Sequence, residues 1–223
     1  MSKQYILVVF IIFASQVYGK TGVTTRYWDC CKPSCSWSGK GPVSRPVQTC
    51  SIKDIPLKNS ANIPSGCDGG NAFACSNQGP FNMSKNVSYG FVAANLKGQK
   101  ESDWCCRCYK LIFTNGPVKG KTMIVQVTNT GYDLQDNHFD IAIPGGGQGI
   151  FTGCDIQYKN YKGGQRYGGI TKQSECNSLP LSLRKGCNWR FSWFKNADNP
   201  LVQFEKIKCP KLLTDISKCM TIG

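Results

Sequence analysis

The 14 cysteines constrain the fold of this 223-residue chain more than any other feature. The first is Cys30, and their even number predicts a disulfide framework formed in an oxidising compartment. Adjacent cysteines, as in Cys30-Cys31 and Cys105-Cys106, rarely bridge each other, because the small ring would strain the peptide between them. Each of these cysteines therefore needs its own partner elsewhere, and the bridges should join distant segments.

Zinc is the competing use of so many cysteines. The cluster of Cys105, Cys106 and Cys108 offers close ligands, but no second C-x-x-C cluster follows. The single histidine, His138, lies elsewhere in the chain. We therefore expect disulfides rather than a metal site, and no cofactor.

The first residues have the pattern of a secretory signal peptide. Lys3 precedes an apolar run from Tyr5 to Ala14, and short side chains lead to Gly19. This run is shorter than the roughly 20 apolar residues that a membrane-spanning helix needs. We expect residues 1–19 to be removed, leaving residues 20–223 as a single domain of a secreted, extracellular protein without a membrane anchor.

The formal net charge of +14 first raises the possibility of nucleic-acid binding. The basic residues are scattered, however, with no block of five or six and no basic helix. A solvated surface explains them better, and no nucleic-acid partner is expected. Two sequons make Asn82 and Asn86 candidates for glycosylation.

Short apolar runs between turn residues predict a mostly-β fold. Residues 122–128 are rich in β-branched side chains, and residues 109–114 precede them across an Asn-Gly turn, so we expect two neighbouring strands. Helical periodicity is limited to residues 180–186. Many short strands favour a barrel or sandwich closed on itself. The further strands that we expect cover residues 90–94, 140–143, 190–194 and 201–208.

Four of the 13 acidic residues, at 133, 136, 140 and 155, fall in one short region. Turn and cap chemistry explains Asp136 and Asp155. Asp140 differs, because it lies between Phe139 and Ile141, where partial desolvation should raise the pKa of its carboxyl group. A carboxylic acid with a raised pKa can act as a general acid near neutral pH.

Two other catalytic arrangements fit this region poorly. His138 and Asp140 share one face of the expected strand without facing each other, and no G-x-S-x-G motif supports a serine nucleophile. The glycines between 145 and 149 form neither phosphate-binding motif. They allow the backbone to approach a ligand closely, or they turn the chain.

A second carboxylate, Asp29, follows Tyr27 and Trp28, with Trp37 nearby in sequence. Aromatic faces pack on the apolar faces of pyranose rings, so this run suits a sugar-binding site. A buried core with one capping aspartate fits the same residues. The pattern alone leaves both interpretations open.

Two long motifs carry a resemblance to a known family. Residues Thr25–Cys35 and Asn137–Phe151, together with Cys154, resemble the signatures of the family 45 glycoside hydrolases. The likeness covers nearly all of residues 20–223, including the order and approximate spacing of the cysteines. It implies a six-stranded double-psi β-barrel with long disulfide-stapled loops and few short helices. It also implies an endo-β-1,4-glucanase that acts on a polysaccharide with inversion. Because no Pro/Ser/Thr-rich linker appears and only four residues follow Cys219, we expect no attached carbohydrate-binding module, and we expect a monomer.

The resemblance further implies roles for individual residues. Asp140 corresponds to the general acid, Asp29 to the general base and Asp133 to an assisting aspartate on a mobile loop. The substrate-binding positions would be Tyr27, Trp37, Thr25, Lys32, His138, Gly146 and Gly147. The implied disulfides are Cys30–Cys154, Cys31–Cys67, Cys35–Cys105, Cys50–Cys75, Cys106–Cys219, Cys108–Cys209 and Cys176–Cys187.

Three questions stay open from the sequence. Residues 53–65 and 158–174 match the family poorly, which leaves the choice between cellulose, xyloglucan, glucomannan and mixed-linkage glucan undecided. A non-hydrolytic wall-loosening protein similar to expansins would share the barrel and the H-F-D motif, but would lack an aspartate at position 29. A wall-binding protein of the barwin kind would carry neither carboxylate. If Arg26 or Lys32 lies near Asp29, we expect its pKa to stay low.

Overall fold

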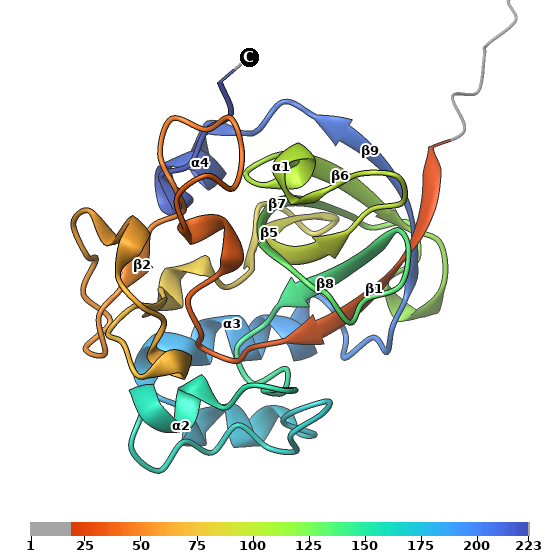
Figure 1. Ribbon diagram of the computed structural model, residues 1–223. Coiled ribbons are helices and arrows are strands. Elements are labelled where there is room, and N and C mark those ends of the chain that lie inside the picture. Colours follow the sequence, from red (N-terminus) through yellow and green to blue (C-terminus); the bar gives the residue numbers. More distant parts are fainter. Residues whose placement is uncertain (1–18, 223) are drawn as a thin grey trace, which may run out of the picture.

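The computed structural model describes residues 19–222, so the signal peptide predicted at residues 1–19 lies almost wholly outside it. Six strands form a closed barrel in the order β5-β7-β6-β9-β1-β8, with β8 pairing back onto β5 (Figure 1). The predicted mostly-β barrel is therefore confirmed. Its strands are β1 (Lys20–Tyr27), β5 (Val87–Asn95), β6 (Cys108–Phe113), β7 (Thr122–Thr130), β8 (His138–Ala142) and β9 (Leu201–Ile207).

Two pairs of barrel strands, β1 with β8 and β5 with β7, run parallel, and the others run antiparallel. The parallel pair β1–β8 places Thr25 opposite Asp140. Two residues that are 115 positions apart in the sequence thus lie side by side on neighbouring strands. The short strand β4 (Phe81–Asn82) pairs with β5 outside the ring, and β2 (Thr49–Cys50) pairs with β3 (Phe73–Ala74) in a small second sheet.

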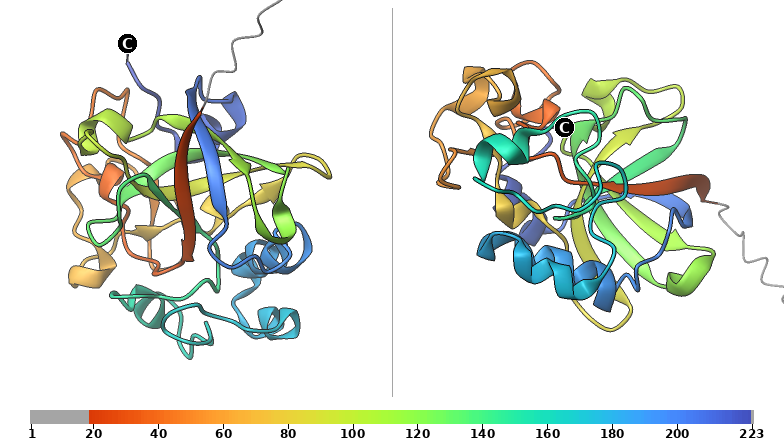
Figure 2. Two further views of the ribbon diagram at one scale, coloured as in Figure 1. Left: turned by 90° about the vertical axis from the view of Figure 1, so that its right-hand side faces the viewer. Right: turned by 90° about the horizontal axis from the view of Figure 1, so that it is seen from below.

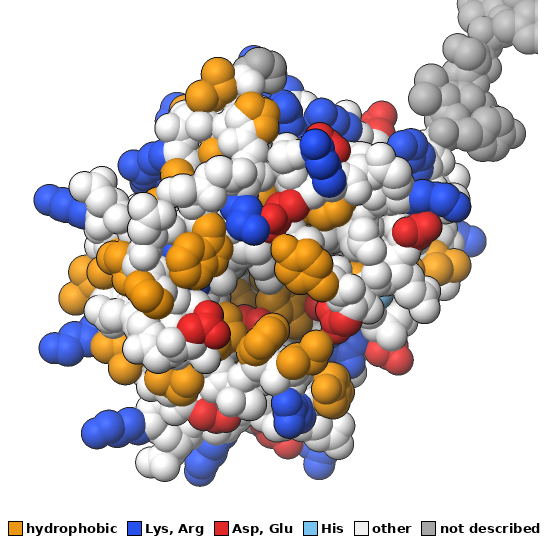
Figure 3. All heavy atoms as spheres, viewed as in Figure 1, with side chains coloured by type: hydrophobic (Ala, Val, Ile, Leu, Met, Phe, Trp, Pro, Cys, Tyr) orange, Lys and Arg blue, Asp and Glu red, His pale blue; other side chains and the backbone are white. Residues whose placement is uncertain are grey.

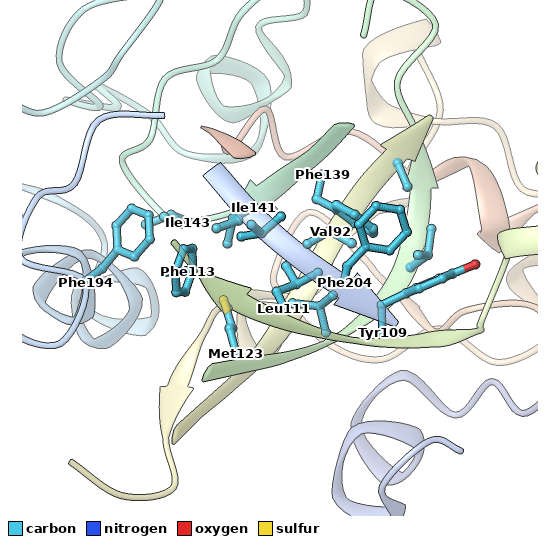
Figure 4. Packing of buried hydrophobic residues seen from close by; sticks show 14 of the residues in the cluster. Val92, Tyr109, Leu111, Phe113, Met123, Phe139, Ile141, Ile143, Phe194 and Phe204 are labelled. Atoms are coloured by element: carbon cyan, nitrogen blue, oxygen red, sulfur yellow. The ribbon is translucent and has the colours of Figure 1, made fainter. Parts of the chain in front are cut away.

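Alternate side chains of the strands fill the barrel interior (Figure 4). Phe139 and Ile141 are fully buried there, and the Phe139 ring packs edge-on against Phe204 with centroids 4.9 Å apart. Because successive side chains of a strand point to opposite faces, Asp140 between them must point away from this core. The apolar neighbours of Asp140 therefore anchor the strand and leave the carboxyl group free for a site.

Seven disulfides hold the long connections around the barrel, and they are the seven pairs that the resemblance implies. Cys30–Cys154 joins the residue after Asp29 to helix α2 (Gly153–Gln157), with Cα atoms 4.9 Å apart. Every described cysteine is bridged. Within residues 19–222, no group of three or more metal-ligating side chains could hold a metal ion.

Three further helices are α1 (Glu101–Trp104), α3 (Leu181–Ser192) and α4 (Lys211–Ser217), and short 3-10 turns lie between the strands. Helices α2 and α3 lie on the same side of the barrel, below it in the orientation of Figure 1, and Figure 2 shows the same arrangement from a second direction. None of the helices in the described part of the chain is long and apolar enough to cross a bilayer.

The strand predicted at residues 190–194 is wrong, and the helix predicted at residues 180–186 is longer than expected. Helix α3 continues through Gly186 to Ser192. A Cβ atom at Gly186 would lie 2.6 Å from Pro144 Cγ, so this glycine allows close packing and does not end the helix. Trp189 and Trp193, four residues apart, stack in the core with centroids 5.4 Å apart. Their spacing is helical, although the apolar run resembled a strand.

Candidate active site

Asp29 and Asp140 lie in the wall of the same cavity, which has a volume of about 370 Å³. Asp140 is in the middle of β8, and Asp29 lies two residues beyond the end of the parallel neighbour β1. Figure 3 shows acidic side chains in a hollow of this face, with hydrophobic side chains around it. The complete lining comprises Tyr27, Asp29, Ala93, Asn129, Thr130, Gly131, Tyr132, Asp133, Asp140, Gln148, Gly149, Ile150 and Phe151.

A hydrogen bond from the neighbouring strand β1 positions the carboxyl group of Asp140. Thr25 Oγ1 donates a hydrogen bond of 2.6 Å to Asp140 Oδ1. The same hydroxyl oxygen lies 2.8 Å from His138 Nε2, which must then be the donor, because the hydroxyl proton points to the carboxylate. Burial lowers the pKa of His138, so its imidazole is neutral with the proton on Nε2. His138 and Asp140 are therefore linked by hydrogen bonds through Thr25, although they do not face each other.

Burial raises the pKa of Asp140 to about 7. The Thr25 hydrogen bond opposes this shift, whereas the negative charges of Asp133 and Asp29 add to it. The raised pKa agrees with the expectation from the apolar neighbours of Asp140. A group with this pKa is still substantially protonated near neutral pH.

Burial also raises the pKa of Asp29 to about 7, and neither neighbouring cation is among the groups that lower it, so the condition for a low pKa is not met. The guanidinium of Arg26 pairs with Asp198 at 3.0 Å instead. The ammonium of Lys32 donates hydrogen bonds of 2.8 to 2.9 Å to three backbone carbonyls, those of residues 60, 61 and 63. Backbone N–H groups favour the ionised form of Asp29, and Cys31 N donates to its Oδ1 at 2.9 Å.

Tyr27 lies in the electrostatic field of both carboxylates. Burial raises the pKa of its phenol well above the usual value, and the negative charges of Asp29 and Asp140 raise it further. Its hydroxyl oxygen accepts a hydrogen bond of 3.2 Å from Asn129 Nδ2. The phenol therefore stays protonated and keeps its O–H available as a donor within the cavity.

The predicted binding residues Lys32, Trp37, His138 and Gly146 are not part of the cavity lining. Lys32 and His138 are buried, and the Lys32 ammonium lies 3.5 Å from the centre of the Trp37 ring. Trp37 does not line the cavity, and its contact with substrate stays a prediction. Gly146 packs on the backbone of Tyr27, where a Cβ atom would lie 3.2 Å from the Tyr27 nitrogen.

Gly147 has a φ of +105°, and a Cβ atom there would lie 2.9 Å from the backbone of Arg166 and Gly168. The two glycines of this turn thus allow close approach between protein segments, and their contact with substrate stays a prediction. They hold the loop after β8 against the end of β1, which is the strand that leads to Asp29.

Asp133 lines the cavity from the exposed segment between β7 and β8. Asp136 lies 3.8 Å from the Lys97 ammonium, and Asp155 is in the first turn of α2, as the turn and cap interpretation expects. Sequence reasoning identified four of the thirteen lining residues, Tyr27, Asp29, Asp133 and Asp140. It missed the other nine, which are Ala93, Asn129, Thr130, Gly131, Tyr132, Gln148, Gly149, Ile150 and Phe151. The signal available for two of them was an aromatic residue directly beside a motif, at Tyr132 before Asp133 and at Phe151 after the glycine run.

Known proteins resemble this chain over nearly all of its described residues. The model of glycosyl hydrolase family 45 matches residues 21–220. An endoglucanase of Cryptopygus antarcticus is 55% identical over 217 residues, covering 96% of each chain. A putative endoglucanase type K of Fusarium oxysporum is 56% identical over 200 residues, covering 89% of this chain and 53% of the relative.

The crystal structure of a cellulase from the Antarctic springtail Cryptopygus antarcticus superimposes with a TM-score of 0.85 at 57% identity. The match covers 90% of this chain and 97% of that one. Family match, sequence identity and fold agree over the same region of the chain. The protein therefore belongs to glycosyl hydrolase family 45 and is a glycoside hydrolase.

Proposed function

We propose that this protein is a secreted endo-β-1,4-glucanase that cleaves internal glucosidic bonds of plant cell-wall glucans with inversion. The observation that carries the proposal is the pair of buried carboxyl groups, Asp29 and Asp140, in the wall of one cavity. Both related proteins described above are named endoglucanases, which supports the same activity. An expansin-like protein would lack the carboxylate of Asp29.

The division of roles follows from the surroundings of the two carboxyl groups. Near pH 7 the pair shares about one proton, because each pKa is about 7 and the charge of Asp29 raises the pKa of Asp140. Asp133 adds negative charge that favours the proton on Asp140. Backbone N–H groups favour the ionised form of Asp29. Asp140 is therefore the acid and Asp29 the base.

In the proposed reaction, Asp29 takes a proton from a water molecule as its oxygen attacks the anomeric carbon. The bond from that carbon to the glycosidic oxygen breaks, and Asp140 gives its proton to the departing oxygen. One displacement suffices, and the configuration at the anomeric carbon inverts. Inverting enzymes place the two carboxyl groups about 6.5 to 9.5 Å apart, leaving room for the water.

An endo-acting hydrolase should lower the viscosity of carboxymethyl cellulose quickly while releasing few reducing ends. Both quantities can be followed in one time course with purified protein. A wall-loosening protein would release no reducing ends, which would reject the proposal. Repeating the assay on xyloglucan, glucomannan and mixed-linkage glucan would establish which glucan is cut best.

Inversion has a direct stereochemical test. Proton NMR of freshly cleaved cello-oligosaccharide is expected to show the α-anomer before mutarotation mixes the two forms. The reason is that water attacks from the face opposite the β-linked leaving group. Early accumulation of the β-anomer would mean retention and would exclude Asp29 as a simple general base.

The Thr25→Val variant tests how Asp140 is tuned. Loss of the hydroxyl removes a hydrogen bond to the ionised form, so the pKa of Asp140 should rise further. The alkaline limb of the kcat/KM profile, which requires protonated Asp140, should move up by about one pH unit. Thr24→Val is the matched control, since the Thr24 hydroxyl donates to Pro200 O on the other face of β1. Equal profiles for both variants would contradict this role of Thr25.

Secretion is part of the proposal and is supported by the pattern of residues 1–19 and by the seven disulfides. Asn82 and Asn86 are both exposed, so both stay candidates for glycosylation. Expression of the full chain in eukaryotic cells should deliver protein that begins near residue 20 to the medium. Retention of uncleaved protein inside the cells would contradict this part of the proposal.

A further inference from the structure

Two exposed aromatic side chains lie in the wall of the cavity that contains both carboxylates. Tyr132 is 81% exposed and Phe151 is 54% exposed, so neither contributes much to the core. Ile150, 53% exposed, lies in the same wall. Single exposed apolar side chains are common on proteins, but several gathered in one concave site mark a ligand groove. This wall therefore presents an apolar surface to whatever enters the cavity.

The two aromatic residues reach the cavity from opposite ends of the strand that carries Asp140. Tyr132 belongs to the segment between β7 and β8, and Phe151 to the segment between β8 and α2 (Figure 1). Asp140 is the middle residue of the five-residue strand β8. A polymer passing over Asp140 along β8 would meet one aromatic ring before the acid and the other after it.

The turn that presents Tyr132 is held in place by its neighbours. Leu134 N donates to Gly131 O at 3.3 Å, and the Leu134 side chain packs against Gly131, where a Cβ atom would collide with it. Asn95 Nδ2 donates to Leu134 O at 2.8 Å and so ties the turn to β5. Leu134 occupies the inner side of the turn, and Tyr132 is left on the outer side.

Hydrogen bonds also hold the segment that contains Phe151. The Arg166 guanidinium donates to Gly149 O at 2.6 Å and to Ile150 O at 2.8 Å. Gln148 Oε1 accepts a hydrogen bond of 3.1 Å from the backbone of Cys154, which is bridged to the residue after Asp29. Aromatic rings on segments held in this way lose little conformational entropy when a ligand binds.

We propose that Tyr132 and Phe151 are sugar-stacking residues that bind the pyranose rings on the two sides of the bond that Asp140 protonates. The inference rests on the proposed function, since it requires a glycan chain across the cavity. The C–H faces of β-linked glucose rings are apolar and complement the electron-rich face of an aromatic ring. Neutral gluco-configured chains are thus the ligand class that this wall fits.

The test compares kcat and KM on cellopentaose for Tyr132→Ala and Phe151→Ala. Each alanine variant should lose about tenfold in kcat/KM, chiefly through a higher KM, because a ring contact to bound sugar is removed. Tyr132→Phe and Phe151→Tyr keep the rings and should recover most of the loss. Leu181→Ala, at an 80%-exposed position of α3 outside the cavity lining, is the surface control and should match the wild type.

A binding measurement distinguishes failure of the stacking role from failure of the proposed glucanase activity. Calorimetry with cellopentaose, in the background of Asp140→Asn, should show Kd about tenfold weaker when either ring is removed. If the wild type cleaves β-1,4-glucan but the alanine variants keep KM and Kd within about twofold of their parents, the stacking role is overturned and the glucanase activity stands. If the wild type cleaves no β-1,4-glucan and binds no cellopentaose, both fail.

Discussion

The Asp140→Asn variant is expected to hydrolyse β-1,4-glucan about 10²- to 10⁴-fold more slowly than the wild type, the contribution of general acid catalysis. An amide fits the same space and still accepts the Thr25 hydrogen bond, but it carries no proton that the departing oxygen can take. The measurement is kcat on carboxymethyl cellulose and on cello-oligosaccharides. Asp136→Asn is the matched control, because Asp136 belongs to the same acidic region but pairs loosely with Lys97 at the surface.

A substrate with a better leaving group makes this test specific. A dinitrophenyl β-cello-oligoside expels a stable phenolate that needs no proton. Asp140→Asn should therefore lose far less activity on it than on cellulose-derived chains. Equal losses on both substrates would mean that the substitution disturbs the site and would reject Asp140 as the acid.

The stability of the folded Asp140→Asn variant can be compared with that of the wild type at different pH values. The folded-state pKa of Asp140, about 7, lies above its unfolded value, so the folded state binds this proton more tightly. The group's contribution to stability is present below about pH 4 and is lost as the pH rises to 7. At pH 8 the variant should be more stable than the wild type by about 1 to 3 kcal/mol, with a higher Tm. At pH 3 this difference should vanish.

The Asp29→Ala variant is expected to lose activity on a similar scale, about 10²- to 10⁴-fold, because no group remains to take the proton from the attacking water. Azide is a nucleophile that needs no base, and the shortened side chain leaves room for it. Added azide should therefore restore turnover and yield an α-configured glycosyl azide from a β-linked substrate. Rates with and without azide, and NMR of the product, provide the measurement.

The matched control for azide rescue is Asp140→Ala. Azide cannot protonate the departing oxygen, so this variant should not recover on cello-oligosaccharides. Failure of azide to restore Asp29→Ala, with an unchanged fold by circular dichroism, would contradict a place for Asp29 beside the anomeric carbon. Recovery of both variants would contradict the assignment of separate acid and base roles.

Local patterns predicted several of the barrel strands but not β1, and they ended helix α3 too early, for a physical reason that particular residues show. Residues 109–114 and 122–128 have β-branched and apolar side chains on both sides of an Asn-Gly turn, and they form β6 and β7. In α3, Gly186 suggested an end because glycine often follows a helix. Gly186 instead allows close packing of the helix on Pro144, and this contact exists only in the folded chain.

The electrostatics of Asp29 show a second limit of local reasoning. Arg26 and Lys32 lie three residues from it in sequence, but Arg26 pairs with Asp198 and Lys32 with carbonyls of residues 60–63. Burial has the largest effect on the pKa of both carboxyl groups. Backbone N–H donors lower the pKa of Asp29, whereas the Thr25 hydrogen bond and the charge of Arg26 lower that of Asp140 and the charges of Asp133 and Asp29 raise it. The condition under which the pKa of Asp29 would stay low is therefore not met, and proximity in sequence could not decide this.

From the sequence alone came the disulfide-rich, mostly-β fold, the family resemblance and the raised pKa of Asp140, because each depends on residue types in short runs or on their spacing. Only the tertiary structure decided that β1 pairs with β8 so that Asp29 and Asp140 share one cavity, that both carboxyl groups have pKa values near 7, and that Tyr132 and Phe151 line the same cavity. Those properties depend on burial and on contacts between segments that are about 100 residues or more apart. Local sequence patterns do not specify such contacts.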